Sequence, residues 1–259
     1  MLLTTLIYSC KKNGVQVIDE TIDFSTVAQI KYFNFGVNAP SVNFYANETK
    51  VTGITSTTGS ESTTGTASGG VYPQSGYTVL PGATYSLKAQ IPTAATDGNL
   101  AIVTLNQNLE NGKRYTLYTS GIYNTTGKSS DGFVIEDKLP AYNNTVAYIR
   151  LVNTISNAPN NLSLYMKSTS ATPPVTDPRL IVNNVAYKTA SEFIAVPIGI
   201  YELYIRYPSA PATNVISRNG TSAVNLAGGK IYTFATRGDI TITSTTAATR
   251  PQIDFTTNR

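Results

Sequence analysis

The sequence predicts an all-β protein made of two tandem immunoglobulin-like antiparallel β-sandwich modules, and three observations predict this class. Thr, Ser, Asn, Tyr, Val and Ile are abundant, and these residues favour strands and turns over helices. Charged residues make up only 13% of the chain, and few windows show a helical period. Apolar and polar residues instead alternate in short blocks that are separated by Pro, Gly and Asn. The length of 259 residues suits one large domain or two of ordinary size.

The first element is a short apolar run, residues 2–9, that ends at Cys10, the only cysteine of the chain. Small or apolar residues directly before a lone cysteine are typical of a bacterial lipoprotein, in which the thiol carries a diacylglycerol. The run is too short to span a bilayer, which takes about 20 apolar residues, and it lacks the basic start of a secretory signal. We expect residues 1–25 to be a lipoprotein signal and tether, with a first strand at residues 15–18. The alternative is that Cys10 is an ordinary thiol beside a strand.

After this tether the sequence repeats itself in four blocks, which occur twice in the same order at a nearly constant offset. The paired blocks are residues 27–34 with 146–153, 38–40 with 157–159, 80–87 with 196–203, and 109–117 with 226–234. Chance would not preserve that order, and the spacing is too long for a solenoid. We expect a first module over residues 26–138 and a second over 146–259, each with its own core. The short linker at residues 138–145 predicts modules that lie close together and hold a limited range of angles.

Each block has the pattern of a strand with one buried face. In residues 201–207 one face consists of Tyr201, Leu203, Ile205 and Tyr207. A period of two places one such face on a core and the other in water. Turn formers such as Asn111-Gly112 and Gly228-Gly229 bound the blocks, which predicts about seven strands per module.

Two polar segments are expected to be loops. Residues 51–70 are almost all Thr, Ser and Gly, and they cannot bury enough apolar area to offset the entropy lost on ordering. We therefore expect a mobile loop in the first module. Residues 168–174 occupy the matching place in the second module, where two prolines make the loop stiffer.

The motifs of both modules resemble the DUF4397 family of bacterial domains of unknown function. In the first module the resemblance lies in the strand Ile30-Lys31-Tyr32-Phe33, the segment Asn38-Ala39-Pro40 and the later Leu-Pro-Gly corner. It implies a β-sandwich on the cell envelope, as in lipid-anchored proteins of Bacteroidetes, and it implies no activity. The family's His and Asp are replaced here by Asn, which speaks against a charge-based or metal-based role; these residues are Asn34, Asn38, Asn153 and Asn157. Each of these Asn side chains is expected to hydrogen-bond the backbone of a turn.

Absent residues exclude several kinds of chemistry. The chain has no histidine, which rules out a Ser-His-Asp triad, a His general base and His-ligated zinc. The acidic pairs Asp19-Glu20 and Glu136-Asp137 point to opposite faces of a strand, so neither forms a glycosidase pair alone. Asp97-Gly98-Asn99 falls far short of a calcium loop. The net charge of +4 is scattered, which does not indicate nucleic-acid binding. We therefore expect no enzyme activity, no cofactor and no metal.

Tyrosine is the remaining candidate for ligand binding. Tyr118, Tyr148 and Tyr204 are expected on strand faces opposite the core, and Tyr123 and Tyr142 near the junction of the modules. Outward tyrosines can stack on sugars or anchor a protein partner, although tyrosine also packs across strands in ordinary sheets.

The expected function is that of a non-catalytic cell-envelope lipoprotein that serves as a binding, adhesion or scaffold module. The alternative is a carbohydrate-binding accessory protein of a glycan-uptake system. The expected partners are the membrane, through the lipid on Cys10, and envelope proteins or glycans. The expected location is the outer membrane, with the periplasmic and the surface face both open.

Overall fold

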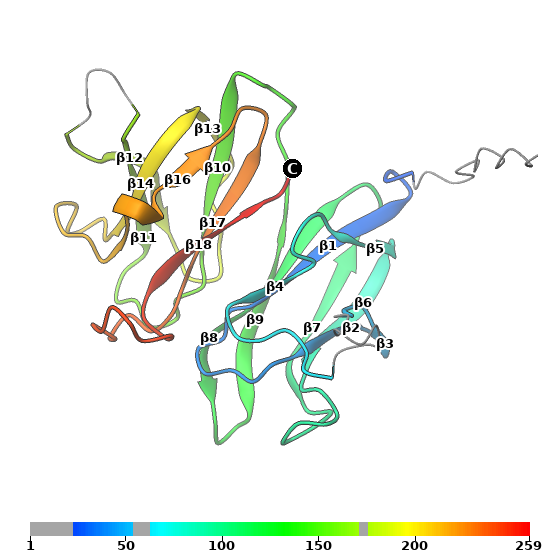
Figure 1. Ribbon diagram of the computed structural model, residues 1–259. Helices are drawn as coiled ribbons and strands as arrows, with labels where there is room; N and C mark the ends of the chain where they lie inside the picture. The colour runs from blue at the N-terminus through cyan, green and yellow to red at the C-terminus, as the bar shows by residue number, and fades with distance from the viewer. Residues whose placement is uncertain (1–22, 54–62, 171–175) are drawn as a thin grey trace, which may run out of the picture.

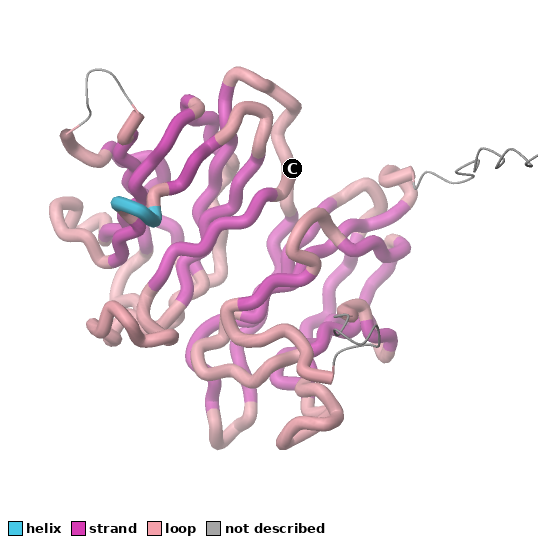
Figure 2. Tube along the Cα trace, viewed as in Figure 1, coloured by secondary structure: helices cyan, strands magenta, loops and turns pink. Residues whose placement is uncertain are grey.

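The computed structural model describes residues 23–53, 63–170 and 176–259, which form eighteen strands and one short 3-10 helix (Figures 1 and 2). Cys10, the tether up to residue 22 and the strand expected at residues 15–18 lie outside the described residues, as do the middles of both expected loops. Within the described residues no helix has the length and apolar character needed to cross a bilayer. The predicted all-β sandwich class is confirmed.

The first module consists of β1 to β9, arranged in two sheets. One sheet has the order β4-β1-β8-β9, with β5 also paired to β1, and the other has the order β3-β2-β6-β7. Its strands are β1 (Val27–Asn34), β2 (Asn43–Ala46), β3 (Thr49–Lys50), β4 (Gly70–Tyr72), β5 (Thr78–Pro81), β6 (Ala83–Gln90), β7 (Ala101–Leu109), β8 (Arg114–Asn124) and β9 (Ser129–Glu136). The core lies between the sheets, where the ring of Tyr32 from β1 stacks on Phe44 from β2 at 4.9 Å between centroids.

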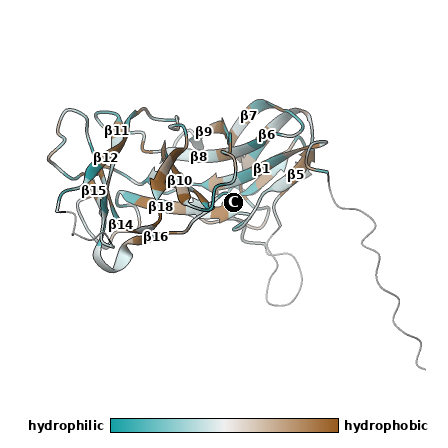
Figure 3. Cartoon of the chain, turned by 90° about the horizontal axis from the view of Figure 1, so that it is seen from above, coloured by the Kyte–Doolittle hydropathy of each residue, from teal (hydrophilic) through white to brown (hydrophobic). Residues whose placement is uncertain are grey.

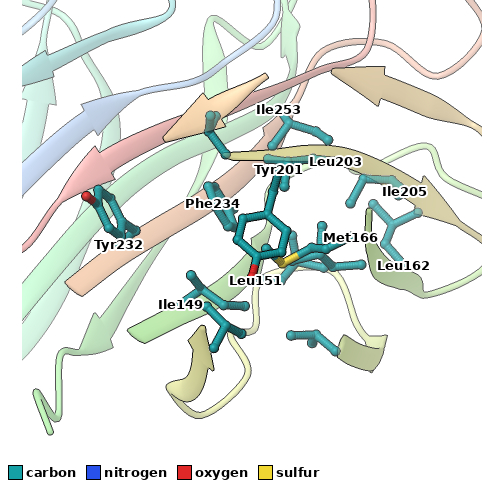
Figure 4. Packing of buried hydrophobic residues seen from close by; sticks show 14 of the residues in the cluster. Ile149, Leu151, Leu162, Met166, Tyr201, Leu203, Ile205, Tyr232, Phe234 and Ile253 are labelled. Atoms are coloured by element: carbon teal, nitrogen blue, oxygen red, sulfur yellow. The ribbon is translucent and has the colours of Figure 1, made fainter. Parts of the chain in front are cut away.

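The second module consists of β10 to β18, again in two sheets. One has the order β13-β10-β17-β18, and the other has the order β12-β11-β14-β15, with β16 also paired to β14. Its elements are β10 (Val146–Asn153), β11 (Leu162–Ser168), β12 (Arg179–Val185), β13 (Ile194–Pro197), β14 (Gly199–Arg206), β15 (Ile216–Arg218), η1 (Gly220–Ser222), β16 (Val224–Leu226), β17 (Ile231–Arg237) and β18 (Gln252–Thr257). Leu151, Phe234 and Leu203 are among the buried residues of its separate core (Figure 4).

The two modules share one pairing scheme. The first strand of each pairs in parallel with a late strand, Gln29 of β1 lying opposite Arg114 of β8 and Tyr148 of β10 opposite Ile231 of β17. On its other edge the first strand pairs antiparallel with β5 or β13. The parallel pairs differ from the purely antiparallel sandwiches that we expected. Parallel neighbours need a long crossover, and here the chain passes through the second sheet before it returns.

Local sequence explains where these strands lie. Tyr201, Leu203 and Ile205 of β14 are at most 9% exposed, so the predicted core face of this strand is confirmed. Gly112 before β8 and Gly229 before β17 have φ of +77° and +75°, a conformation that glycine adopts without the steric penalty of a Cβ atom. The turns predicted at Asn-Gly and Gly-Gly therefore stand at equivalent places in the two modules.

The prediction that residues 51–70 form a mobile loop is wrong for the C-terminal part of this segment, from Thr66 to Gly70. Thr66 forms a β-bridge with Val42, and Gly70 begins β4, which pairs with β1. Asn34 on β1 holds this segment, because its side-chain Nδ2 donates to the carbonyl of Thr66 at 2.9 Å and its own carbonyl accepts from Gly69 at 2.6 Å. The polar composition of this segment gave no indication that its backbone would form these hydrogen bonds.

Candidate functional site

The faces of β1, β8 and β9 that point away from the first core lie against β10 and β17 of the second module (Figures 1 and 3). Four aromatic rings of the first module form most of this contact. The Tyr118 ring lies between Phe33 at 4.8 Å and Phe133 at 5.1 Å, both stacked. Val152 and Ala235 of the second module pack on this cluster. We call this contact the junction.

A buried ion pair joins the modules at the junction. Arg150 on β10 donates from its guanidinium to Asp137, which follows β9, and the two side chains are 2% and 0% exposed. The Nε of Arg150 also donates to the hydroxyl of Thr233 at 2.9 Å, and its guanidinium lies 4.7 Å from the Phe193 ring centroid. The other carboxylate oxygen of Asp137 accepts from Thr116 at 2.6 Å. Every contact of this ion pair therefore lies inside the fold.

Hydrogen bonds extend this pair across both modules. The hydroxyl of Tyr77 donates to Asp137 at 2.8 Å and accepts from the amide of Asn258 at 2.7 Å, while Asn258 Oδ1 accepts from Thr233 at 2.7 Å. Burial, together with the nearby charge of Asp137, raises the pKa of Tyr77 far above its usual range, so this hydroxyl keeps its proton. The result is a continuous chain of donors and acceptors between the two sheets.

A second cation, Lys31 on β1, is completely buried beside this network. Its Nζ donates to the carbonyl of Thr257 at 3.3 Å and lies 5.3 Å from the Tyr77 ring centroid. Burial lowers the pKa of Lys31, and the charge of Asp137 offsets only part of that shift. The network thus holds two basic side chains, Lys31 and Arg150, against one carboxylate.

A second polar contact lies where Tyr187 of the second module meets β8 and β9. Its hydroxyl donates to Asp131 at 2.7 Å and lies 3.0 Å from the hydroxyl of Ser120, while Lys188 pairs with Asp131 at 2.9 Å. Burial would raise the pKa of Asp131, but the hydrogen bonds from Lys188 and Tyr187 outweigh it and lower that pKa. A Cβ atom at Gly121 would lie 2.8 Å from the Tyr187 hydroxyl, so a larger residue there would have to displace this hydroxyl.

Two of the predicted ligand-binding tyrosines are not exposed. Tyr118 was expected to face water and is completely buried, because the second module covers the face of β8 opposite the core. Tyr204 is only 7% exposed. It does lie on the outer face of β14, but its hydroxyl donates to Glu202 at 2.8 Å and Arg206 lies 6.0 Å from its ring centroid. The expectation of free rings at these two positions is wrong.

The other three tyrosines are dispersed. Tyr148 on β10 is partly buried, and Tyr123 on β8 packs against the first core. Tyr142, in the linker, is 69% exposed and has Arg259 at 5.8 Å from its ring centroid. The ring also lies against Gly229, where a Cβ atom would come within 2.6 Å. The structure therefore does not bring the five tyrosines together, and Tyr142 alone among them offers an exposed ring.

Three of the four asparagines that replace family residues make side-chain hydrogen bonds, and the fourth, Asn38, is exposed. Asn153 Oδ1 accepts from the backbone of Ile155, two residues on, at 3.0 Å, as expected for a turn cap. Asn157 Oδ1 accepts from Ile240 at 3.2 Å. Asn34 bonds the carbonyls of Pro40 and Thr66, and Asn38 has a φ of +57°.

Analysis of the sequence missed Lys31, Arg150 and Asp137 as the charged centre of the junction. A usable signal was present, because a basic residue interrupts the apolar first strand at the same position in both repeats. A cleft of about 220 Å³ opens beside the ion pair and is lined from both modules, with Glu136, Lys138 and Glu192 among its residues. Among the described residues no three His, Cys, Asp or Glu side chains cluster as metal ligands would.

Comparison with known proteins gives one family and several remote structural similarities. The model of the family described as Domain of unknown function (DUF4397) matches residues 28–163, more than half of the chain. No curated protein matches the chain.

Among solved structures, the chain is similar to the Bacillus anthracis TIE protein, with 13% identity, a TM-score of 0.24 and coverage of 82% of this chain. The chain spans about a third of that protein's length, 34%. It is also similar to CBMbc (family CBM26) from Eubacterium rectale Amy13K in complex with maltoheptaose, with 11% identity, a TM-score of 0.25, and coverage of 88% of this chain and 94% of that chain. At these TM-scores neither similarity bears on the function of this chain.

Proposed function

The chain belongs to the DUF4397 family, and we propose that it is a non-catalytic binding, adhesion or scaffold module of the bacterial cell envelope whose two sandwiches act as one rigid body. The observation that carries this proposal is the junction. A buried ion pair, a chain of hydrogen bonds and an aromatic cluster there all join residues of both modules.

The energetics of the junction favour rigidity. Domains in one chain move relative to each other unless their interface is large and well packed. Rotation of these modules would separate Arg150 from Asp137, whose side chains are 2% and 0% exposed. Breaking a buried ion pair costs about 3–5 kcal/mol, because one charge is left uncompensated. A rigid pair of sandwiches is suited to holding a binding surface at a fixed distance from its attachment.

The chemistry of the chain supports a non-catalytic role. It has no histidine, and the two junction acids, Asp131 and Asp137, are held by cations and hydroxyl groups inside the fold. Attachment would come from a lipid on Cys10, since two or more acyl chains hold a protein stably at a membrane. The proposed location is the outer membrane, and the proposed partner is an envelope protein.

Attachment is tested by labelling cells that express the full chain with an alkynyl fatty acid. Wild type should carry the label and sediment with membranes, while Cys10→Ser should do neither. Protease treatment of intact cells then distinguishes the surface face from the periplasmic face. Equal labelling of both proteins would refute the anchor.

Rigidity is tested separately, by measuring the distance between two spin labels in the Cys10→Ser chain. Suitable label sites are Glu48 in the first module, which is 87% exposed, and Thr213 in the second, which is also exposed. We expect one narrow distance distribution that Arg150→Ala broadens and that Lys128→Ala, at an exposed pair with Asp97, leaves unchanged. A broad distribution in the otherwise unmodified chain would overturn the rigid-body proposal.

A second candidate function, glycan binding, is favoured by Tyr142 alone. Its ring is 69% exposed and rests on Gly229, and such a ring can stack on a sugar. The test is a glycan array with the full chain. Saturable binding that is lost in Tyr142→Ala and kept in Tyr204→Ala, where the native ring is already covered, would support glycan uptake. Absence of saturable sugar binding would remove this candidate.

A further inference from the structure

An apolar cavity of about 360 Å³ opens in the second module between β12 and β13, which are edge strands of its two sheets. This volume lies in the range of small-molecule sites, about 300–1,000 Å³. The most buried lining residues are Met166, Val196 and Tyr201, which are 3%, 4% and 9% exposed and belong to the module's core (Figure 4). The cavity therefore adjoins the apolar packing of the core on one side, while Arg179 and Ile198 on its open side are exposed.

A β-bulge on β12 places the side chain of Ile181 in the wall of this cavity. Leu164 of β11 lies opposite Val182 of β12, while the next residue, Tyr165, lies opposite Leu180. Ile181 is therefore an extra residue on β12, and it lines the cavity. Bulges at sheet edges redirect side chains in this way and often stand beside binding sites.

A cation without a partner stands at the same wall. Arg179 lies opposite Met166, whose side chain belongs to the core, so the two side chains lie on the same face of the sheet and both line the cavity. No hydrogen bond, ion pair or ring contact of the Arg179 side chain is found among the residues that the structure describes. Two hydroxyl groups, from Ser168 and Ser170, complete the polar part of the lining. Arg179 is exposed, so its guanidinium lies at the mouth of the cavity, and the apolar side of the cavity is formed by core residues. An apolar cavity with one cation at its mouth is complementary to a molecule with an apolar body and one anionic group.

We infer that this cavity binds one molecule of a small anionic amphiphile of the fatty-acid type. The alkyl chain would lie along Met166, Ile181 and Val196. The carboxylate would reach the guanidinium of Arg179, whose planar donors suit bidentate pairing with a carboxylate. This site goes beyond the proposed scaffold role and does not depend on it, because it lies within one module and needs neither the membrane anchor nor a partner protein.

The test is calorimetric titration of the Cys10→Ser chain with saturated carboxylates from hexanoate to tetradecanoate, below their micelle concentrations. Each added methylene should tighten the dissociation constant about fourfold while it is buried. The gain should stop at the length that fills the cavity, and the stoichiometry should be one to one. Non-specific association with apolar surface would show no such limit.

Variants locate the site. Arg179→Gln should weaken decanoate binding about tenfold, since hydrogen bonds to charged groups contribute about that much, and it should leave the dependence on chain length unchanged. Arg206→Gln, on the outer face of β14, is the matched control and should bind like wild type. Decyltrimethylammonium should bind more weakly than decanoate to the wild-type cavity.

Ile181→Phe should block the cavity, and Ser168→Leu provides a second blocking variant should the first unfold, as circular dichroism would reveal. Three results would overturn the inference: no saturable binding of any carboxylate, binding that both blocking variants retain, or equal affinity for the cationic and anionic amphiphiles. None of these results would affect the anchoring and rigidity tests.

Discussion

Lys31 and Arg150 occupy the same position in the two modules, yet they meet different partners. Each is the fifth residue of its module's first strand, β1 or β10, and each projects toward the other module. Arg150 reaches the carboxylate of Asp137 in the first module. Lys31 reaches only the carbonyl of Thr257 in the second.

The partners are equivalent as well. Asp137 donates its backbone N–H to Arg114 at 2.7 Å and accepts from the hydroxyl of Thr116. Asn258 donates its backbone N–H to Ile231 at 2.8 Å and accepts from the hydroxyl of Thr233. The second module thus carries a neutral amide where the first carries a charge. Two copies of one fold can therefore form an unsymmetrical interface, with one cation neutralised and the other left in excess.

The largest effect is expected from removing the neutralised cation. Arg150→Met leaves the carboxylate of Asp137 buried without its partner, which should lower the free energy of unfolding by about 3–5 kcal/mol. Urea unfolding at neutral pH measures this loss. Replacing all three charges, in Lys31→Met with Arg150→Met and Asp137→Leu, should restore most of it, because no charge of this network then remains buried.

The control for that prediction is Lys88→Met, which removes the cation of a pair whose carboxylate on Glu48 is 87% exposed. Exposed pairs contribute little to stability. If Arg150→Met cost no more than this control, the buried pair would not be holding the modules together.

Removing the excess cation is expected to have the opposite sign. Lys31→Met relieves the burial of a second positive charge while Arg150 and Asp137 stay paired. We expect it to raise the free energy of unfolding at pH 7 by about 1 kcal/mol, as when buried charges are replaced by apolar residues of similar size. A loss of stability instead would show that Asp137 needs both cations.

The pH dependence provides an independent check on Lys31. Its pKa is lowered by burial below the ordinary value of 10.5, so the unfolded chain binds this proton more tightly than the folded chain. Wild type should therefore gain stability as pH rises through the folded pKa toward 10.5, whereas Lys31→Met lacks this gain. The advantage of the variant should shrink over that range. Effects of Tyr77 and Tyr118 are common to both proteins and cancel in the difference.

These residues also show what could be predicted from the sequence. Alternation placed Leu203 and Ile205 on a core correctly, and glycines at 112 and 229 marked turns correctly, because both depend on neighbours in the chain. The same alternation placed Tyr118 on the opposite face of its strand, and this too is correct. What covers that face depends on how two modules pack, and a period of two carries no information about that. The prediction of an exposed ring failed for this reason.

The prediction of the candidate site failed for the same reason, because that site also depends on how distant segments pack. Glu136 and Asp137 were expected to point to opposite faces of a strand, and the pattern did not reveal that Arg150 lies against Asp137 across the linker. The cavity beside Arg179 depends on a bulge at Ile181, and no turn residue or change of period in the sequence marks this bulge. Sites that form where distant segments pack together cannot be predicted from the local patterns of a single sequence.

Supplying the missing carboxylate would test the comparison between the modules directly. Asn258→Asp places a second acid at the position equivalent to Asp137, where Lys31 can pair with it. Asn258→Asp loses the amide donor to Tyr77 in every background. We expect it to cost less stability in the presence of Lys31 than in the Lys31→Met background, because Lys31 can pair with the new carboxylate. A double-mutant cycle from urea unfolding measures this coupling, and a coupling energy near zero would mean that the two positions do not communicate.

A modest effect is expected at Tyr187, whose hydroxyl donates to Asp131 at the other polar contact of the junction. Tyr187→Phe removes this bond and should cost about 0.5–1.5 kcal/mol at neutral pH. The pKa of Asp131 is lowered below its ordinary 3.8, so its contribution is present above that pH and is lost as pH falls through the folded pKa. The difference between wild type and Tyr187→Phe should therefore shrink below about pH 4. Urea midpoints measured from neutral to acid pH would reveal this, and a difference independent of pH would show that the hydroxyl acts through Ser120, which lies 3.0 Å away and does not titrate.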